Sequence, residues 1–297
     1  MTLEARDLDP SAAGAGTDSV SYRDAYSDPA ITHALSRRLH ATAQGRPGRV
    51  IMEVCGTHTM SIFRHGVRAL LPSNLRLISG PGCPVCVTPP VYLDQAIALA
   101  RRADVTITTF GDLVRVPGSA SSLEREKADR ADVRIVYSPL DAVDLAERFR
   151  AEGTERTVVF LGVGFETTTP GAAQAILEAR RRGISNFRVL GCHRRVVPAL
   201  EALLRNPALR LDGFLLPGHV SVVLGSDAYR FLAGRGVSGV VAGFEPVDIL
   251  RALVRLLELI EGGHPGVENP YPRLVSAGGN LRALAAMDEV FEPVDAP

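Results

Sequence analysis

Several features that would place this sequence in a broad class are missing from it. It has no stretch of about 18 uninterrupted apolar residues, the usual minimum for a membrane-spanning helix. Its 33 Lys and Arg residues balance its 33 Asp and Glu residues, and no run of five or more basic residues occurs. Because a neutral chain has no general field that attracts phosphates or anionic lipids, we expect no nucleic acid and no membrane among its partners.

The N-terminal stretch lacks the features of an export signal. Residues 1–25 are rich in acidic and small residues, without a basic segment followed by an apolar one. We therefore expect a cytoplasmic protein in which residues 1–25 form a flexible tail, because they hold few large apolar side chains. Apolar residues make up 46% of the chain, which is enough for a core that needs no disulfide bonds.

Cysteine is scarce, with only Cys55, Cys83, Cys86 and Cys192 in the chain. In a protein without an export signal, cysteines more often serve catalysis, redox chemistry or metal binding than structural disulfides. Any one of them could also be a small buried apolar residue.

The common catalytic and nucleotide-binding motifs are absent as well. The sequence has no nucleophile elbow, no H-E-x-x-H helix and no P-loop. The glycine-rich run over residues 162–170 lacks the lysine of a Walker sequence and the glycine spacing of a dinucleotide fingerprint. We therefore do not predict nucleotide binding.

The sequence does contain a regular alternation of short apolar strands and amphipathic helices. This pattern predicts parallel sheets covered by helices on both faces. About eight strands fit two Rossmann-like α/β domains that face a central cleft. We place the boundary near Ser138-Pro139, which gives domains at residues 26–138 and 139–262 and a C-terminal helical segment at 263–297.

The run from Cys55 to His58 follows a predicted strand and opens a predicted helix, with Thr57 as a plausible cap. Free amides at the helix start favour a thiolate at Cys55, and His58 lies on the same turn. The two side chains suit a borderline metal such as iron, or a Cys-His nucleophile pair. They could equally be a buried cysteine beside a capping histidine.

Cys83 and Cys86 form a C-x-x-C motif with a proline inside and a glycine before it. This arrangement is typical of thiol–disulfide exchange, in which one thiolate is stabilised and the other resolves. It could also be half of a zinc or iron–sulfur site.

Other polar residues also follow predicted strands. Glu166 is a candidate acid, base or hydrogen-bond acceptor, and its alternative role is a capping carboxylate near a helix start. His219 and the Cys192-His193 pair lie at similar strand ends, where functional groups gather in α/β folds. A single histidine at such a position is more often structural than a ligand.

Seven segments taken together resemble one family, the hydrogenase maturation factor HypD. They read, in order, EVCGTHT, LISGPGCPVCVTP, TFGDLVRVPGS, VRIVYSPLDA, GFETTTP, GFLLPGHVSVVLG and VAGFEPVDIL. The resemblance as a whole runs from about residue 27 to the end.

This resemblance implies a maturation scaffold rather than a conventional turnover enzyme. In the family, HypD and HypC together hold an iron that carries two cyanides and one carbon monoxide, and HypE with HypF supplies the cyanide. It also implies a role for individual residues: Cys55 as the iron-binding thiolate with His58 as its metal-site neighbour, Cys83 and Cys86 as a redox-active pair, and Glu166 and His219 as site residues. We also expect Thr57 and Gly164 to take part in binding the cofactor. We expect a monomer within a heteromeric complex with HypC and HypE.

The sequence departs from the family at one point. Family members usually continue into a third domain whose cysteines bind a [4Fe-4S] cluster, but this chain has no cysteine after Cys192. We therefore expect the cluster domain to be absent here and the electron relay to Cys83 and Cys86 to be altered. The alternative functions are a thiol–disulfide oxidoreductase centred on that pair and a degenerate paralogue that binds partners without handling iron.

Overall fold

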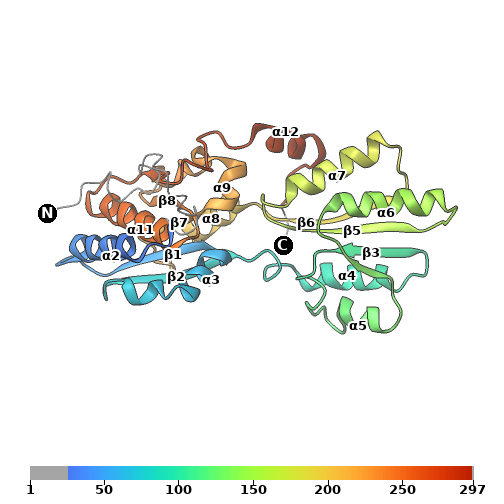
Figure 1. The fold of residues 1–297 in the computed structure, drawn as a ribbon, viewed down its shortest axis with the longest axis horizontal. Helices are drawn as coiled ribbons and strands as arrows, with labels where there is room; N and C mark the ends of the chain where they lie inside the picture. Colours follow the sequence, from blue (N-terminus) through green and yellow to red (C-terminus); the bar gives the residue numbers. More distant parts are fainter. Residues whose placement is uncertain (1–25, 296–297) are drawn as a thin grey trace, which may run out of the picture. The chain divides into compact units, whose positions relative to one another are not determined.

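A computed structural model describes residues 26–295, and these form two compact units (Figure 1). The first unit consists of residues 26–82 and Val197–Asn280. The second unit consists of Cys83–Val196 and the C-terminal segment from Leu281. The tail predicted for residues 1–25 lies outside the described residues.

The first unit is built on a five-stranded sheet in the order β2-β1-β7-β8-β9, in which all neighbours pair in parallel. Its strands are β1 (Arg49–Cys55), β2 (Leu75–Gly82), β7 (Gly213–Pro217), β8 (Ser238–Ala242) and β9 (Val267–Glu268). Its helices are α2 (Pro29–Ala43), α3 (Gly56–Arg64), η2 (Val67–Leu70), α8 (Val196–Leu204), α9 (Gly218–Leu224), η3 (Ser226–Tyr229), α10 (Phe231–Gly234) and α11 (Pro246–Glu261).

The core of the first unit lies between the sheet and the pair α2 and α11. Apolar residues recur at helical spacing along α11, so that one broad face of this helix is buried. That face packs with Leu35 and Leu39 of α2 and with Ile51 of β1 in one continuous cluster. The first unit is therefore organised around β1, whose carboxyl end carries Cys55.

The second unit has a four-stranded sheet in the order β4-β3-β5-β6, again with parallel pairs only. Its strands are β3 (Val105–Thr109), β4 (Val133–Ile135), β5 (Thr157–Gly164) and β6 (Phe187–His193). Its helices are α4 (Pro90–Ala100), α5 (Leu123–Ala128), α6 (Pro139–Ala151), α7 (Thr169–Arg181) and α12 (Leu281–Val290).

Helices cover both faces of this second sheet. Val159 and Leu161 of β5 pack into a cluster with α4, whereas Val158 and Phe160 pack into another with α6 and α7. Because alternate residues of a strand point to opposite faces, an almost continuously apolar β5 fills both clusters. The predicted α/β class with two parallel sheets is thus confirmed.

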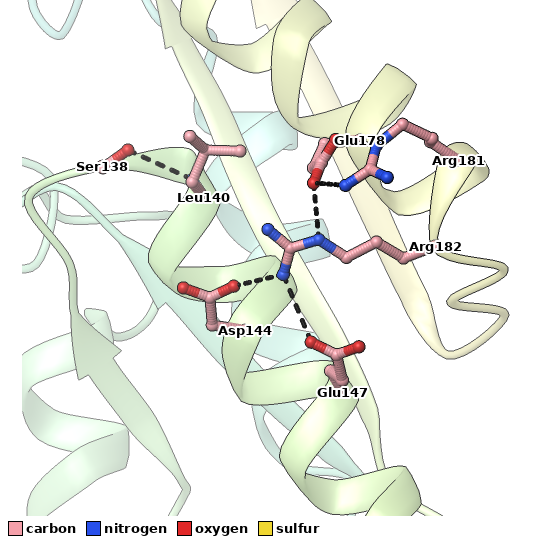
Figure 2. A network of polar contacts seen from close by, with 7 residues as sticks. All are labelled: Ser138, Leu140, Asp144, Glu147, Glu178, Arg181 and Arg182. Atoms are coloured by element: carbon pink, nitrogen blue, oxygen red, sulfur yellow. Dashed lines mark hydrogen bonds and ion pairs between the residues drawn. The ribbon is translucent and has the colours of Figure 1, made fainter.

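Charged side chains tie α6 to α7 on the outside of the second unit (Figure 2). The Arg182 guanidinium, just past the end of α7, donates to Asp144 at 2.6 Å and Glu147 at 3.2 Å on α6. It also donates to Glu178 at 2.6 Å, and Arg181 bonds the same carboxylate. At the start of α6, the Ser138 hydroxyl accepts from the Leu140 amide at 3.2 Å.

The domain boundary predicted near Ser138-Pro139 is wrong, because it falls inside the second unit. β3 pairs with both β4 and β5, which lie on the two sides of that position. The chain instead changes units after Gly82, after Val196 and after Asn280. The prediction assumed that each sheet is made from one continuous stretch, and local patterns do not record which distant strands pair.

The predicted C-terminal helical segment at residues 263–297 is only partly helical. Val267–Glu268 adds an edge strand to the first sheet, and the helix α12 is confined to Leu281–Val290. Within residues 26–295, no helix is long and apolar enough to cross a membrane.

Candidate functional site

Cys55 is the last residue of β1 and the residue that caps the start of α3. Its thiol is free and partly exposed. No side chain caps this helix, so the predicted capping role of Thr57 is wrong: Thr57 lies inside α3 and is exposed. The first amides of α3 are therefore left without a side-chain acceptor next to Cys55.

The strand beside Cys55 passes unusually close to it. Cys55 pairs with Gly82 of β2 after an irregularity in the register that follows Glu53. A Cβ atom on Gly82 would lie 1.8 Å from the carbonyl oxygen of Val54 and 2.6 Å from the Cα of Cys55. Only glycine fits here, which explains why this residue type precedes Cys83 in the chain.

His58 is completely buried one turn into α3. Its Nε2 lies 2.9 Å from the carbonyl oxygen of Gly243, so that Nε2 carries the proton and donates it. Burial lowers the pKa of His58 to about 4 despite the backbone acceptors, and the ring is therefore neutral at neutral pH. Its Nδ1 is buried, has no hydrogen-bond partner and presents a free lone pair.

His219, the second residue of α9, is linked to His58 through an aromatic ring. Phe244 stacks on His219 with centroids 3.9 Å apart and on His58 with centroids 4.5 Å apart. Burial also lowers the pKa of His219. The first unit thus gathers two of the predicted site residues around Phe244, which the sequence reasoning did not single out although it lies in the segment VAGFEPVDIL.

Cys83 and Cys86 form a disulfide bond at the beginning of the second unit. Their Cα atoms are 5.2 Å apart, and the Cys86 amide lies 3.2 Å from the Cys83 sulfur. Cys86 is exposed, so that a thiol or thiolate from solution can reach one of the two sulfurs. This geometry is compatible with the predicted exchange chemistry, and redox activity itself stays a prediction.

Glu166 is buried two residues after the end of β5, and both of its carboxylate oxygens accept from the Val196 amide, at 3.0 and 3.2 Å. Burial raises the pKa of Glu166, while the bonds from its own amide and that of Val196 and the charge of Arg195 oppose the rise. Val196 is the first residue of α8, so Glu166 acts on the start of a helix, as the capping alternative predicted. Its catalytic role stays a prediction.

Gly164 is tightly packed by its neighbours. A Cβ atom on this residue would lie 1.6 Å from the Thr168 hydroxyl oxygen. Its missing side chain thus makes room for Thr168, and its predicted part in ligand binding stays a prediction.

The Cys192-His193 pair ends β6, and its two side chains belong to opposite faces of the second sheet. Cys192 packs on the face covered by α4, and burial raises the pKa of its thiol. The His193 ring lies 5.4 Å from the Phe291 ring beyond α12, and its Nε2 is buried without a partner. Burial lowers the pKa of His193 to about 4.

The donors present in the first unit fit a borderline metal such as iron. A sulfur and an unprotonated imidazole nitrogen are suitable donors for a borderline metal. The buried Nδ1 of His58 has no protein partner, which is the state expected of a nitrogen reserved for a ligand. Among residues 26–295, no group of three or more His, Cys, Asp or Glu side chains is arranged to hold a metal alone.

These observations define an α/β protein with two parallel sheets. In the first sheet, strand β1 leads into a Cys-His turn, and a C-x-x-C disulfide precedes the strands of the second sheet in the chain. The chain belongs to the HypD family: the family model described as the hydrogenase formation hypA family matches residues 30–297.

Known relatives agree with this family over most of the chain. A hydrogenase maturation factor HypD from Azotobacter vinelandii is 46% identical over 280 residues, which cover 92% of this chain and 73% of that protein. The HypD of Rhodobacter capsulatus is 46% identical over 281 residues, with the same coverage. The HypD of Escherichia coli strain K12 is 46% identical over 264 residues, covering 88% of this chain and 69% of that protein.

Proposed function

We propose that this protein is a hydrogenase maturation factor that binds iron while its Fe(CN)2CO unit is assembled, together with HypC and HypE. The observation that carries this proposal is the Cys55–His58 turn. It places a free thiol at a helix start and, one turn on, a buried neutral imidazole whose Nδ1 has no partner. The names of the relatives support the maturation role, and the family resemblance supports the particular cargo and partners.

Each residue of this turn has a defined task in the proposal. The Cys55 sulfur is the thiolate ligand that binds the iron. His58 stays neutral because of its burial, so that its Nδ1 offers a lone pair at neutral pH. Cyanide and carbon monoxide are strong-field ligands that suit low-spin Fe(II), and a thiolate is a suitable protein anchor for it.

Infrared spectroscopy tests the proposal directly. The protein is co-expressed with HypC, HypE and HypF, purified without oxygen, and examined for CO and CN stretching bands. We expect the bands in the unchanged protein, their loss in Cys55→Ala and their retention in Cys192→Ala, which removes the other free thiol. Bands of full intensity in Cys55→Ala would exclude Cys55 as the iron anchor.

The Cys83–Cys86 disulfide favours a second candidate, a thiol–disulfide oxidoreductase. In that reaction a substrate dithiol gives up two electrons and two protons and becomes a disulfide, while Cys83 and Cys86 become thiols. This candidate predicts turnover of small dithiol or disulfide substrates and an inactive Cys86→Ser variant. Full activity in Cys86→Ser would exclude it.

A degenerate paralogue is the third candidate, and one measurement separates it from the first. It predicts normal binding of HypC without uptake of iron. Metal analysis of the purified complex with HypC therefore decides between the two, because measurable iron that is lost in Cys55→Ala would exclude a degenerate protein.

A further inference from the structure

We propose that Phe244 is a positioning residue that holds the His58 ring in one orientation and one tautomer, so that Nδ1 is the nitrogen left free. This inference rests on the proposed function for its consequence in iron binding. The positioning itself is a property of the iron-free protein and is tested separately.

The helix that carries His58 is fixed to the segment after β8 by two consecutive carbonyl groups. His58 Nε2 donates to the Gly243 oxygen at 2.9 Å, and the Ser61 hydroxyl donates to the Phe244 oxygen in a short hydrogen bond. His58 and Ser61 are three residues apart and therefore lie on the same face of α3. The pair of carbonyls thus fixes both the position and the rotation of this helix relative to β8.

The segment that supplies these carbonyls is itself held in place. A Cβ atom on Gly243 would lie 2.3 Å from a carboxylate oxygen of Asp248 and 2.6 Å from the Tyr271 ring. Asp248 is buried and receives a hydrogen bond of 2.5 Å from Arg273. The Gly243 carbonyl therefore has little freedom to move away from His58.

One hydrogen bond leaves the imidazole ring free to tilt about the Cβ–Cγ bond, which swings Nε2 away from the Gly243 oxygen. The ring of Phe244 restrains this tilting. It stacks on His58 with an interplanar angle of 28° and on His219 with an angle of 29°. Phe244 is also packed on His219, so its stacking on His58 keeps the imidazole in the plane in which Nε2 reaches Gly243.

As a result, the only ring proton of the neutral imidazole lies on Nε2, which donates it in a hydrogen bond to the Gly243 carbonyl. Nδ1 therefore keeps its lone pair. Without the Phe244 ring, the His58 ring can turn, and the proton can occupy either nitrogen. Residues that orient a histidine ligand in this way typically contribute about 10- to 100-fold to metal affinity. Phe244 contacts no iron in this proposal and acts only through His58.

The test uses two substitutions at this position. Phe244→Leu keeps an apolar side chain and removes the aromatic face, whereas Phe244→Tyr keeps the face. The first readout is 15N NMR of histidine-labelled, iron-free protein, with the His58 signals assigned from a His58→Gln variant. We expect one tautomer with protonated Nε2 in the unchanged protein and in Phe244→Tyr, and averaged or doubled signals in Phe244→Leu. An unchanged single tautomer in Phe244→Leu would overturn the proposal.

The second readout is the infrared spectrum of the complex co-expressed with HypC, HypE and HypF. We expect CO and CN bands about tenfold weaker per protein in Phe244→Leu and of normal intensity in Phe244→Tyr. If the unchanged protein shows no bands, the proposed function fails, while the NMR result still decides the positioning. If Phe244→Leu does not fold, Phe244→Met replaces it, because methionine is also apolar and lacks the aromatic face; an unchanged single tautomer in Phe244→Met would overturn the proposal.

Discussion

Glu166 binds the first amide of α8 with both carboxylate oxygens, which lie 3.0 and 3.2 Å from the nitrogen of Val196. The first amides of a helix have no partner inside the helix, and this one is buried. The chain also passes from the second unit to the first directly after Val196. Glu166 therefore anchors the residue at which the chain changes units.

We expect Glu166→Ala to lower the free energy of unfolding by about 1–3 kcal/mol, because it leaves the buried Val196 amide without an acceptor. Glu166→Gln keeps a carbonyl oxygen and should lose less than half as much. Urea unfolding followed by circular dichroism measures the stability of both variants. Thr167→Ala, which changes the exposed neighbouring residue, is the control. Equal stability of the alanine variant and the unchanged protein would contradict the anchoring role and favour a purely chemical one.

The close approach of β2 to β1 predicts that Gly82→Ala is strongly destabilising. The added Cβ would lie 1.8 Å from the Val54 oxygen, so that β2 has to move away from Cys55. We expect a loss of about 1–3 kcal/mol in the free energy of unfolding, the range typical of forced overpacking. Gly56→Ala is the matched control, because its Cβ meets nothing closer than 3.9 Å; similar losses in both variants would contradict the steric explanation.

The network in Figure 2 predicts that two adjacent arginines differ in their effect on stability. Arg182 bonds two carboxylates of α6 as well as Glu178, whereas Arg181 bonds only Glu178. We expect Arg182→Ala to lower the melting temperature more than Arg181→Ala, since only Arg182 ties α7 to α6. The difference should shrink in 1 M salt, which screens exposed charges. Equal melting temperatures at low salt would show that the links to α6 contribute nothing.

The partly buried His193 predicts a pH dependence of stability in weak acid. Its pKa falls from 6.5 to about 4 in the folded protein, so that between these values the unfolded chain binds a proton and the folded chain does not. This difference stabilises the unfolded state as the pH drops from 6.5 to 4, by up to about 3 kcal/mol. We expect His193→Gln to lose less stability over this range than the unchanged protein. Parallel curves of unfolding free energy against pH for the two proteins would contradict the assignment.

Local patterns in the sequence predicted the elements and the positions of the reactive groups well. Apolar runs such as β5 and their alternation with helices predicted two parallel sheets. Cys55 and the Cys83–Cys86 pair lie at strand ends, as expected of an α/β fold. These predictions succeed because each depends on only a few neighbouring residues.

Relationships between distant residues were not predictable from such patterns. His58 bonds Gly243, 185 residues further along the chain, and Phe244 follows directly. Glu166 could be an acid, a base or a cap until Val196, 30 residues away, was seen to donate to it. The strand order 2-1-7-8-9 in the first sheet likewise joins segments that a sequence pattern leaves unconnected, which is why the predicted domain boundary failed.

That strand order has a consequence for how the protein is made. The ribosome synthesises β1 early. However, β1 gains its second neighbouring strand, β7, only after Gly213, the partner of Ile51, has been synthesised. Meanwhile the strands of the second sheet, from Val105 to His193, leave the ribosome as one uninterrupted stretch. We expect the second sheet to close first on the nascent chain, while the Cys55 turn remains without its Gly243 contact until residue 243 has been synthesised. The turn proposed to hold iron is thus synthesised early, but its His58 gains the Gly243 contact only late in synthesis.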